Sequence, residues 1–306
     1  VKGQIVWSEG FGYADVEQRV PVWPSITRFR VGSTAKTMTA VAVGQLYEQG
    51  RLDLDVQVQD YVPSFPQKNG IVTTRLLAGH LGGIRHYQSD EFLSQQPYTT
   101  VLDGLKIFQD DPLVGPPGDQ YSYSTYGWNL ISAVVETASQ QKFLSYMDQH
   151  VFKQIGMNQT GADHVNPIVL NRGRYYVVED GQVFNAPPVD NSYKWAGGGF
   201  LSTSEDLVRF GFAHIYPVVL KPETVELLWT PQKTISGVET GYGIGWSVGM
   251  DDQGRRWVGH GGGSIGGSTQ LKMYPAAKLV VVIITNMSGA NYRDLPEKVA
   301  ELFMNQ

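Results

Sequence analysis

The segment that most constrains this chain begins at Ser33, has Lys36 three residues later and ends at Gly50. The residues that follow Lys36 are apolar on every side of a helix, which predicts a buried helix rather than an amphipathic surface helix. Gly50 is placed where a left-handed residue closes a helix. A buried helix has no structural use for a lysine in its first turn, so Lys36 indicates chemistry.

Ser33 and Lys36 are three residues apart, a spacing that puts two side chains on one helix face about 5–6 Å apart. Burial disfavours the ammonium form of a lysine, so Lys36 can accept a proton. A serine hydroxyl is a weak nucleophile until such a base activates it. Backbone N–H groups at a helix N-terminus also favour negative charge. The spacing therefore predicts a nucleophile, a base and an oxyanion donor within one turn.

Ser-x-x-Lys is expected about once by chance in a chain of this length. A second copy is present at Ser139 and Lys142. This copy lies in a polar break between two apolar runs, so its lysine is predicted to be solvated. Spacing alone does not separate the two copies, and the interpretation of Ser33 depends on the rest of the chain.

Composition and charge exclude several classes of function. The 306 residues are 42% hydrophobic and 17% charged, as in a soluble globular protein with one large domain or two lobes. The net charge of -5 argues against a nucleic-acid partner, and no apolar stretch is long enough for a membrane span. The chain has no cysteine and no His-x-x-x-His spacing, which argues against thiolate chemistry and a zinc hydrolase. We therefore predict no cofactor.

The order of elements predicts an α+β fold, an α/β sandwich whose antiparallel sheet is flanked by helices. Short strands separated by turns are expected at 4–8, 242–248, 257–259, 267–274 and 279–286. Helices are expected at 73–79, 100–108, 126–137, 143–155, 206–215, 222–228 and 293–304. Residues 1–60 and 170–306 are expected to form the sheet lobe, and 61–169 an inserted, mainly helical lobe, with the site between them.

Local motifs refine this outline. Asp180-Gly181 predicts a hairpin turn, and Ser202-x-x-Glu205 predicts a capping box that opens the helix at 206–215. No signal peptide precedes the first expected strand, and the chain is expected to begin inside a fold, with an edge strand and a leading helix missing from the sequence.

Gly262-Gly263-Ser264-Ile265-Gly266 offers a competing nucleophile, because it matches the Gly-x-Ser-x-Gly elbow of α/β-hydrolases. That motif needs a helix after the serine and a histidine later in the chain. The residues that follow are strand-like, and His260 is the last histidine. Residues 261–266 also match the glycine pattern of dinucleotide-binding loops, but the helix that must follow such a loop is not expected here. An α/β-hydrolase that uses Ser264 stays a separate hypothesis.

Two further motifs join the first. Tyr123-Ser124-Thr125 lies in a tyrosine-rich turn, and His260-Gly261-Gly262 ends a strand. In this order the three motifs resemble the Ser-x-x-Lys, Tyr-x-Asn and Lys/His-x-Gly motifs of the serine β-lactamase and penicillin-binding-protein-like family. The resemblance is to its branch of class C β-lactamases, D-Ala-D-Ala carboxypeptidases and family VIII esterases. Stretches at 76–87, 156–160 and 197–207 extend it, and the chain looks closest to β-lactamase-like proteins of the mitochondrial and bacterial type.

The resemblance implies an acyl-enzyme mechanism. Ser33 would attack a carbonyl, and Lys36 and Tyr123 would share proton transfer, with the ammonium favouring a tyrosinate. The backbone N–H groups of Ser33 and Gly263 would form the oxyanion hole. His260 would face the site and orient Tyr123 or the substrate.

Three departures from the family pattern bear on the substrate. Thr125 replaces the asparagine, Gly261 has no hydroxyl, and His260 replaces a lysine that would bind a carboxylate. Thr125, Gly261 and Gly262 are still expected to line the substrate site. We therefore predict a serine hydrolase of small esters, peptides or amides with weak or no β-lactamase activity.

Two alternatives remain. The chain could be a β-lactamase or D-Ala-D-Ala carboxypeptidase, or a non-catalytic scaffold or penicillin-binding sensor on the same fold. The resemblance favours an exported bacterial protein, or a mitochondrial protein if the source is a eukaryote.

Overall fold

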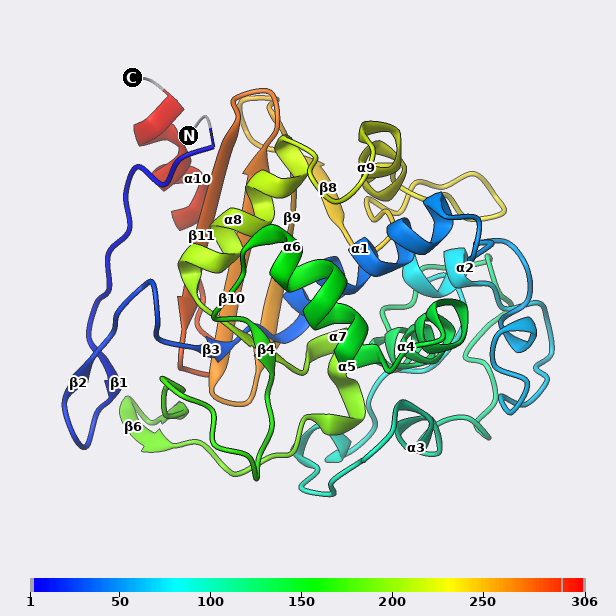
Figure 1. Cartoon of the computed structure of the whole chain (residues 1–306), viewed down its shortest axis with the longest axis horizontal. Coiled ribbons are helices and arrows are strands. Elements are labelled where there is room, and N and C mark those ends of the chain that lie inside the picture. Colours follow the sequence, from blue (N-terminus) through cyan, green and yellow to red (C-terminus); the bar gives the residue numbers. More distant parts are fainter. Residues whose placement is uncertain (1–2, 293, 305–306) are drawn as a thin grey trace.

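The computed structural model describes residues 3–292 and 294–304. Its largest sheet is antiparallel, has four strands in the order β11-β10-β9-β8, and joins neighbours in the chain by short turns (Figure 1). The strands are β8 (Ser247–Met250), β9 (Arg256–Ser264), β10 (Gly267–Tyr274) and β11 (Leu279–Thr285). Short connections force antiparallel pairing, which is the arrangement predicted from the spacing of these runs.

Helices cover both faces of this sheet. Alternate residues of a strand point to opposite faces, so Val280 lies in the main core while Val281 lies in a second cluster. Helix α8 (Ser204–Ile215) packs on the first face, where Phe210 joins the main core. Helix α10 (Leu295–Met304) packs on the other, where Ala300 is fully buried. This arrangement confirms the predicted α+β fold class.

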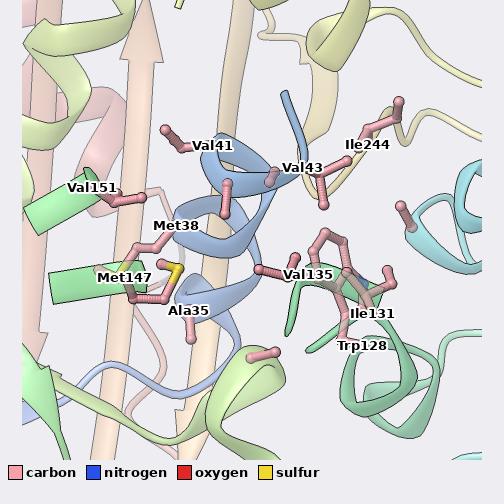
Figure 2. Close-up of a cluster of buried hydrophobic side chains, with 14 of the residues drawn as sticks. Ala35, Met38, Val41, Val43, Trp128, Ile131, Val135, Met147, Val151 and Ile244 are labelled. Carbon is pink, nitrogen blue, oxygen red and sulfur yellow. The ribbon is translucent and has the colours of Figure 1, made fainter. Parts of the chain in front are cut away.

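Helix α1 (Ala35–Glu48) is buried at the centre of the molecule, as predicted. Its two sides contact Met147 and Trp128, which come from different helices (Figure 2). Gly50 has φ +66°, which is the left-handed conformation expected after the last turn. A short 3-10 turn, η1 (Gly32–Thr34), precedes α1 and carries Ser33.

The remaining elements surround α1. Helices α2 to α6 lie in the chain between β3 and β4, and α7 and α9 follow; their bounds are α2 (Thr74–Ala78), α3 (Val101–Leu105), α4 (Thr125–Ser139), α5 (Phe143–Tyr146), α6 (Lys153–Ile155), α7 (Trp195–Gly198) and α9 (Pro222–Trp229). A π-helical segment, η4 (Met147–Phe152), joins α5 to α6. Smaller sheets pair β1 (Tyr13–Asp15) with β2 (Val20–Pro21), β5 (Tyr176–Glu179) with β6 (Gln182–Asn185), and β7 (Phe200–Ser202) with β3 (Phe29–Arg30) and β4 (Gly161–Ala162). Within the described residues, every helix is too short or too polar to cross a bilayer.

Three local predictions were wrong. Residues 4–8 form no strand, and their apolar side chains are exposed, with Val6 at 56% and Trp7 at 55%. The cap of α8 is Thr203, whose hydroxyl accepts from the Asp206 N–H at 3.1 Å, because Ser202 lies within β7. The strand predicted at 242–248 begins only at residue 247, since Gly245 takes a left-handed φ of +80°. The C-terminal helix was predicted from Arg293, which lies outside the described residues.

Close backbone contact brings β9 against the turn before α1. A Cβ added to Gly262 would lie 1.9 Å from the Val31 carbonyl oxygen, so only glycine fits there. A Cβ added to Gly263 would meet nothing within 4 Å. The two neighbouring glycines therefore differ in their surroundings. Gly262 lets the strand approach the turn, and Gly263 faces open space.

We expect Gly262→Ala to lower the free energy of unfolding by about 2 kcal/mol or more, because the added methyl group meets rigid backbone. Gly263→Ala is the matched control and should stay close to the parent protein. Chemical denaturation of the three proteins would measure this, and equal stability of both variants would contradict the packing argument.

Candidate active site

Ser33 lies in the turn η1, partly exposed, at the point where β9 passes closest to the start of α1. The neighbouring Gly32 has φ +51°, and a Cβ there would lie 2.6 Å from the Gly263 carbonyl oxygen and 2.7 Å from its nitrogen. The backbone around Ser33 and the backbone of Gly263 are thus in direct contact. This places both predicted oxyanion donors on adjacent segments.

Lys36 lies one turn further along, and its side chain is fully buried. Its Nζ lies 3.1 Å from the Ser33 Oγ, 3.1 Å from the Thr125 Oγ1 and 2.7 Å from the Gly197 carbonyl oxygen. None of these partners is a carboxylate. Burial lowers the pKa of Lys36 well below its ordinary value, and the charge of Lys194 lowers it further.

The three partners determine how a neutral Lys36 amine is oriented. A neutral amine has two N–H groups and one lone pair. The Gly197 carbonyl can only accept a hydrogen bond, so it takes one N–H. The Thr125 hydroxyl can accept the second N–H. The lone pair then faces Ser33, which is the arrangement a general base requires.

Tyr123 approaches Ser33 from another segment, and its side chain interacts with the Ser33 hydroxyl. The Lys36 Nζ lies 4.9 Å from the centre of the Tyr123 ring. Burial raises the pKa of Tyr123, and the interaction with Ser33 opposes this only in part. The prediction that Lys36 favours a tyrosinate was wrong in its physical premise, because the same burial that raises the pKa of the phenol lowers the pKa of the amine.

His260 lies on β9 and is buried, but its partners differ from those expected. Its Nδ1 bonds to the carbonyl of Gly261, so Nδ1 carries the proton and Nε2 accepts from the Tyr242 hydroxyl at 2.8 Å. The ring centre is 6.4 Å from that of Tyr123. Burial lowers the pKa of His260 to about 3, so the ring is neutral at neutral pH. Its hydrogen bonds orient Tyr242, not Tyr123.

The other predicted substrate-site residues divide into two groups. Gly261 and Gly263 are exposed on β9, beyond Gly259, where the pairing with β8 ends. Gly262 is packed against the turn before Ser33, and Thr125 is buried with its hydroxyl held by Lys36. Thr125 therefore faces Lys36, the predicted general base, rather than a substrate.

The structure separates Ser33 from its sequence competitors. Lys142 of the second Ser-x-x-Lys is exposed, as predicted, and the Ser139 Oγ bonds only to backbone groups. Ser264 ends β9 at a tight turn into β10 rather than into a helix, and its buried Oγ has no hydrogen-bond partner within residues 3–292 and 294–304. Neither serine has a base beside it.

The sequence interpretation missed several residues of the site: His80, His86, Tyr87, Lys194 and Tyr242. The rings of His80 and His86 lie 4.2 and 5.5 Å from that of Tyr123. The family-like stretches were the available sequence signal for these residues: the stretch at 76–87 contains His80, His86 and Tyr87, and the stretch at 197–207 follows shortly after Lys194. Their contacts join segments far apart in the chain, so spacing could not reveal them.

Lys194 is a second buried lysine near Lys36, only 5% exposed. Among the described residues its Nζ makes no hydrogen bond, and it lies 5.4 and 5.2 Å from the ring centres of Tyr87 and Tyr193. Burial lowers its pKa from 10.5 to about 7, and the positive charge of Arg30 adds to this. A site with two unneutralised lysines favours the uncharged amine on both.

Comparison with known proteins gives a consistent result. A family model described as Beta-lactamase matches residues 1–302. The human protein "Serine beta-lactamase-like protein LACTB, mitochondrial" is 34% identical over 98% of this chain and 74% of its own length. Penicillin-binding protein 4* of Bacillus subtilis is 25% identical, over 98% and 69%. The crystal structure of a penicillin-binding protein from Bacillus halodurans is 27% identical, with a TM-score of 0.82 over 96% of this chain and 91% of that one. These similarities confirm the resemblance that the three motifs predicted.

We expect Lys194→Met to stabilise the protein more at pH 6.5 than at pH 9.5. The folded pKa is about 7 and the unfolded pKa is near 10.5, so between these values the unfolded chain binds a proton that the folded chain does not. The wild type therefore loses stability as the pH falls through this window, by about 3 kcal/mol between the two conditions, and the variant avoids that loss.

Urea denaturation at both pH values would measure this difference, with Lys142→Met as the control at an exposed lysine. A stability difference that does not change with pH would contradict the assignment of an uncharged Lys194.

Proposed function

Because this chain belongs to the beta-lactamase family, we propose that it is a serine hydrolase that cleaves small esters, peptides or amides through an acyl-enzyme on Ser33. The observation that carries the proposal is the fully buried Lys36 Nζ, 3.1 Å from the Ser33 Oγ and without a carboxylate partner. Burial disfavours the ammonium form of such a lysine, so its amine can remove the serine proton.

Acylation follows from this geometry. The Ser33 hydroxyl transfers its proton to the Lys36 lone pair as Oγ bonds to the substrate carbonyl carbon. Negative charge develops on the carbonyl oxygen, which the N–H groups of Ser33 and Gly263 stabilise by roughly 3–4 kcal/mol per donor. The neutral Tyr123 phenol then gives its proton to the leaving group as the bond to the carbonyl carbon breaks. The Lys36 ammonium returns a proton to Tyr123.

Deacylation restores the enzyme by the same groups. Water takes the position of the leaving group and gives a proton to the Lys36 amine as its oxygen bonds to the acyl carbon. The bond to Ser33 Oγ then breaks, and Oγ recovers its proton from the Lys36 ammonium. The carboxylic acid is released and the resting state is regenerated.

Substrate preference follows from what β9 and Thr125 offer. The Thr125 hydroxyl is committed to Lys36, so no side-chain amide binds the substrate from this position. Gly261 contributes no hydroxyl, and His260 is neutral and bonded to Tyr242. A β-lactam or D-Ala carboxylate would therefore lack the usual partners from β9. This supports esters or amides over β-lactams and D-Ala-D-Ala termini.

We expect Ser33→Ala to lower kcat/KM for a p-nitrophenyl ester by 1,000-fold or more (on the order of the loss of a serine nucleophile). Lys36→Met should cause a loss of similar size, because removing either member of a nucleophile and base pair disables both. Initial-rate assays on purified protein, together with fluorophosphonate labelling located by mass spectrometry, would measure this.

The controls are Ser264→Ala and Ser139→Ala, which should retain the parent rate. Faster turnover of a chromogenic cephalosporin than of esters would contradict the proposed substrate preference. No turnover of esters, amides or β-lactams, with a labelled Ser33, would favour a penicillin-binding sensor, and no labelling would favour a non-catalytic scaffold.

A further inference from the structure

We propose that His80 is a positioning residue that holds the Tyr123 phenol in place to protonate the leaving group. This inference rests on the proposed function and assigns a role to a residue outside the three motifs. It is carried by contacts of His80 with both neighbours of Tyr123 and with the Tyr123 ring itself.

His80 binds the backbone on both sides of Tyr123. Its carbonyl oxygen accepts from the Ser122 N–H at 2.8 Å, and its Nδ1 accepts from the Ser124 N–H at 3.1 Å. The backbone N–H groups of the residues before and after Tyr123 are thereby tied to one residue. Because both bonds lie within buried or partly buried structure, the Cα–Cβ direction of Tyr123 is set by His80.

The His80 ring also orients the Tyr123 side chain. The two ring centres are 4.2 Å apart with an angle of 37° between the planes. The ring of Tyr242 lies 4.7 Å from His80, so the imidazole is packed between two tyrosines. Aromatic contacts of this kind restrict ring rotation. This packing limits rotation of the Tyr123 side chain, whose hydroxyl interacts with Ser33.

The backbone of His80 is held in an unusual conformation. Its φ is +61°, in the left-handed region that glycine and asparagine adopt more easily than histidine. It lies just after α2, where its N–H bonds to the Leu77 carbonyl at 3.1 Å. A histidine at such a position, 1% exposed, indicates that the imidazole itself is needed.

His80 does not serve as a base. Its Nδ1 already accepts a hydrogen bond, so Nε2 carries the proton, and Nε2 has no hydrogen-bond partner in the part of the chain that the structure describes. Burial and the nearby charge of Lys36 lower the pKa of His80 well below its ordinary value. The neutral ring thus has no free lone pair for the reaction. Its contribution is the placement of Tyr123.

The leaving group provides the test. Ethyl butyrate and p-nitrophenyl butyrate form the same acyl-enzyme, but ethoxide needs a proton on leaving and p-nitrophenolate does not. His80→Asn keeps an acceptor and tolerates the left-handed backbone, while it removes the ring contact. We expect kcat/KM for ethyl butyrate to fall by about 100-fold, the scale of general-acid catalysis, and that for p-nitrophenyl butyrate to fall by less than about 5-fold.

Tyr123→Phe should show the same leaving-group dependence if the proposal holds. The double variant His80→Asn/Tyr123→Phe should then be no slower on ethyl butyrate than Tyr123→Phe alone, because both substitutions disable one step. His214→Asn is the control, since this buried imidazole packs on Trp246 away from the site. It should lower neither rate by more than about 2-fold.

Equal losses on both esters, or losses that multiply in the double variant, would overturn the proposal. Should His80→Asn fail to fold by circular dichroism, His80→Phe keeps a ring against Tyr123 and removes only the acceptor. It should show the same preference for the better leaving group with a smaller loss, and equal losses there would also overturn the proposal. Absence of Ser33-dependent turnover of either ester in the parent protein would instead refute the proposed function.

Discussion

The contact between the Lys36 amine and the Ser33 hydroxyl is the interaction on which the rest of the site depends. An amine without a carboxylate partner is stable in a dry interior only when it is neutral, and its hydrogen bonds must then be satisfied by uncharged groups. Thr125 and the Gly197 carbonyl supply these bonds. They direct the remaining lone pair at Ser33. Burial, which usually penalises a lysine, thereby favours the unprotonated amine that can accept a proton.

Close backbone packing makes this burial possible. A Cβ on Gly197 would lie 2.5 Å from the Thr125 side chain, and one on Gly262 would lie 1.9 Å from the Val31 carbonyl. The absence of side chains at these glycines lets α7 and β9 approach the first turn of α1. Water is excluded from Lys36 by the same contacts that bring Gly263 next to Ser33. Stability and chemistry are therefore linked through a few positions where only glycine fits.

The burial that lowers the pKa of Lys36 also shifts the pKa values of its neighbours. Burial lowers the pKa values of His86 and His260 to about 4 and about 3, and it raises that of Tyr123. The site thus consists of neutral hydrogen-bonding groups around one neutral amine, with Lys194 nearby and also held uncharged above about pH 7. In such an environment each proton has a defined position. The placement of Tyr123 by neighbouring rings then matters more than the charge of any single side chain.

The sequence by itself determined the buried helix, the antiparallel sheet and the choice of Ser33, because apolar periodicity and the order of three motifs are local properties. It did not predict the strand boundary at Gly245 or the cap at Thr203, where one residue's backbone conformation decides the outcome. Only the tertiary structure decided which groups surround the amine. Lys36 is 89 residues from Thr125 and 161 from Gly197, and spacing carries no information about contacts at that range. The direction of each pKa shift was likewise set by burial, which exists only once those distant segments have packed together.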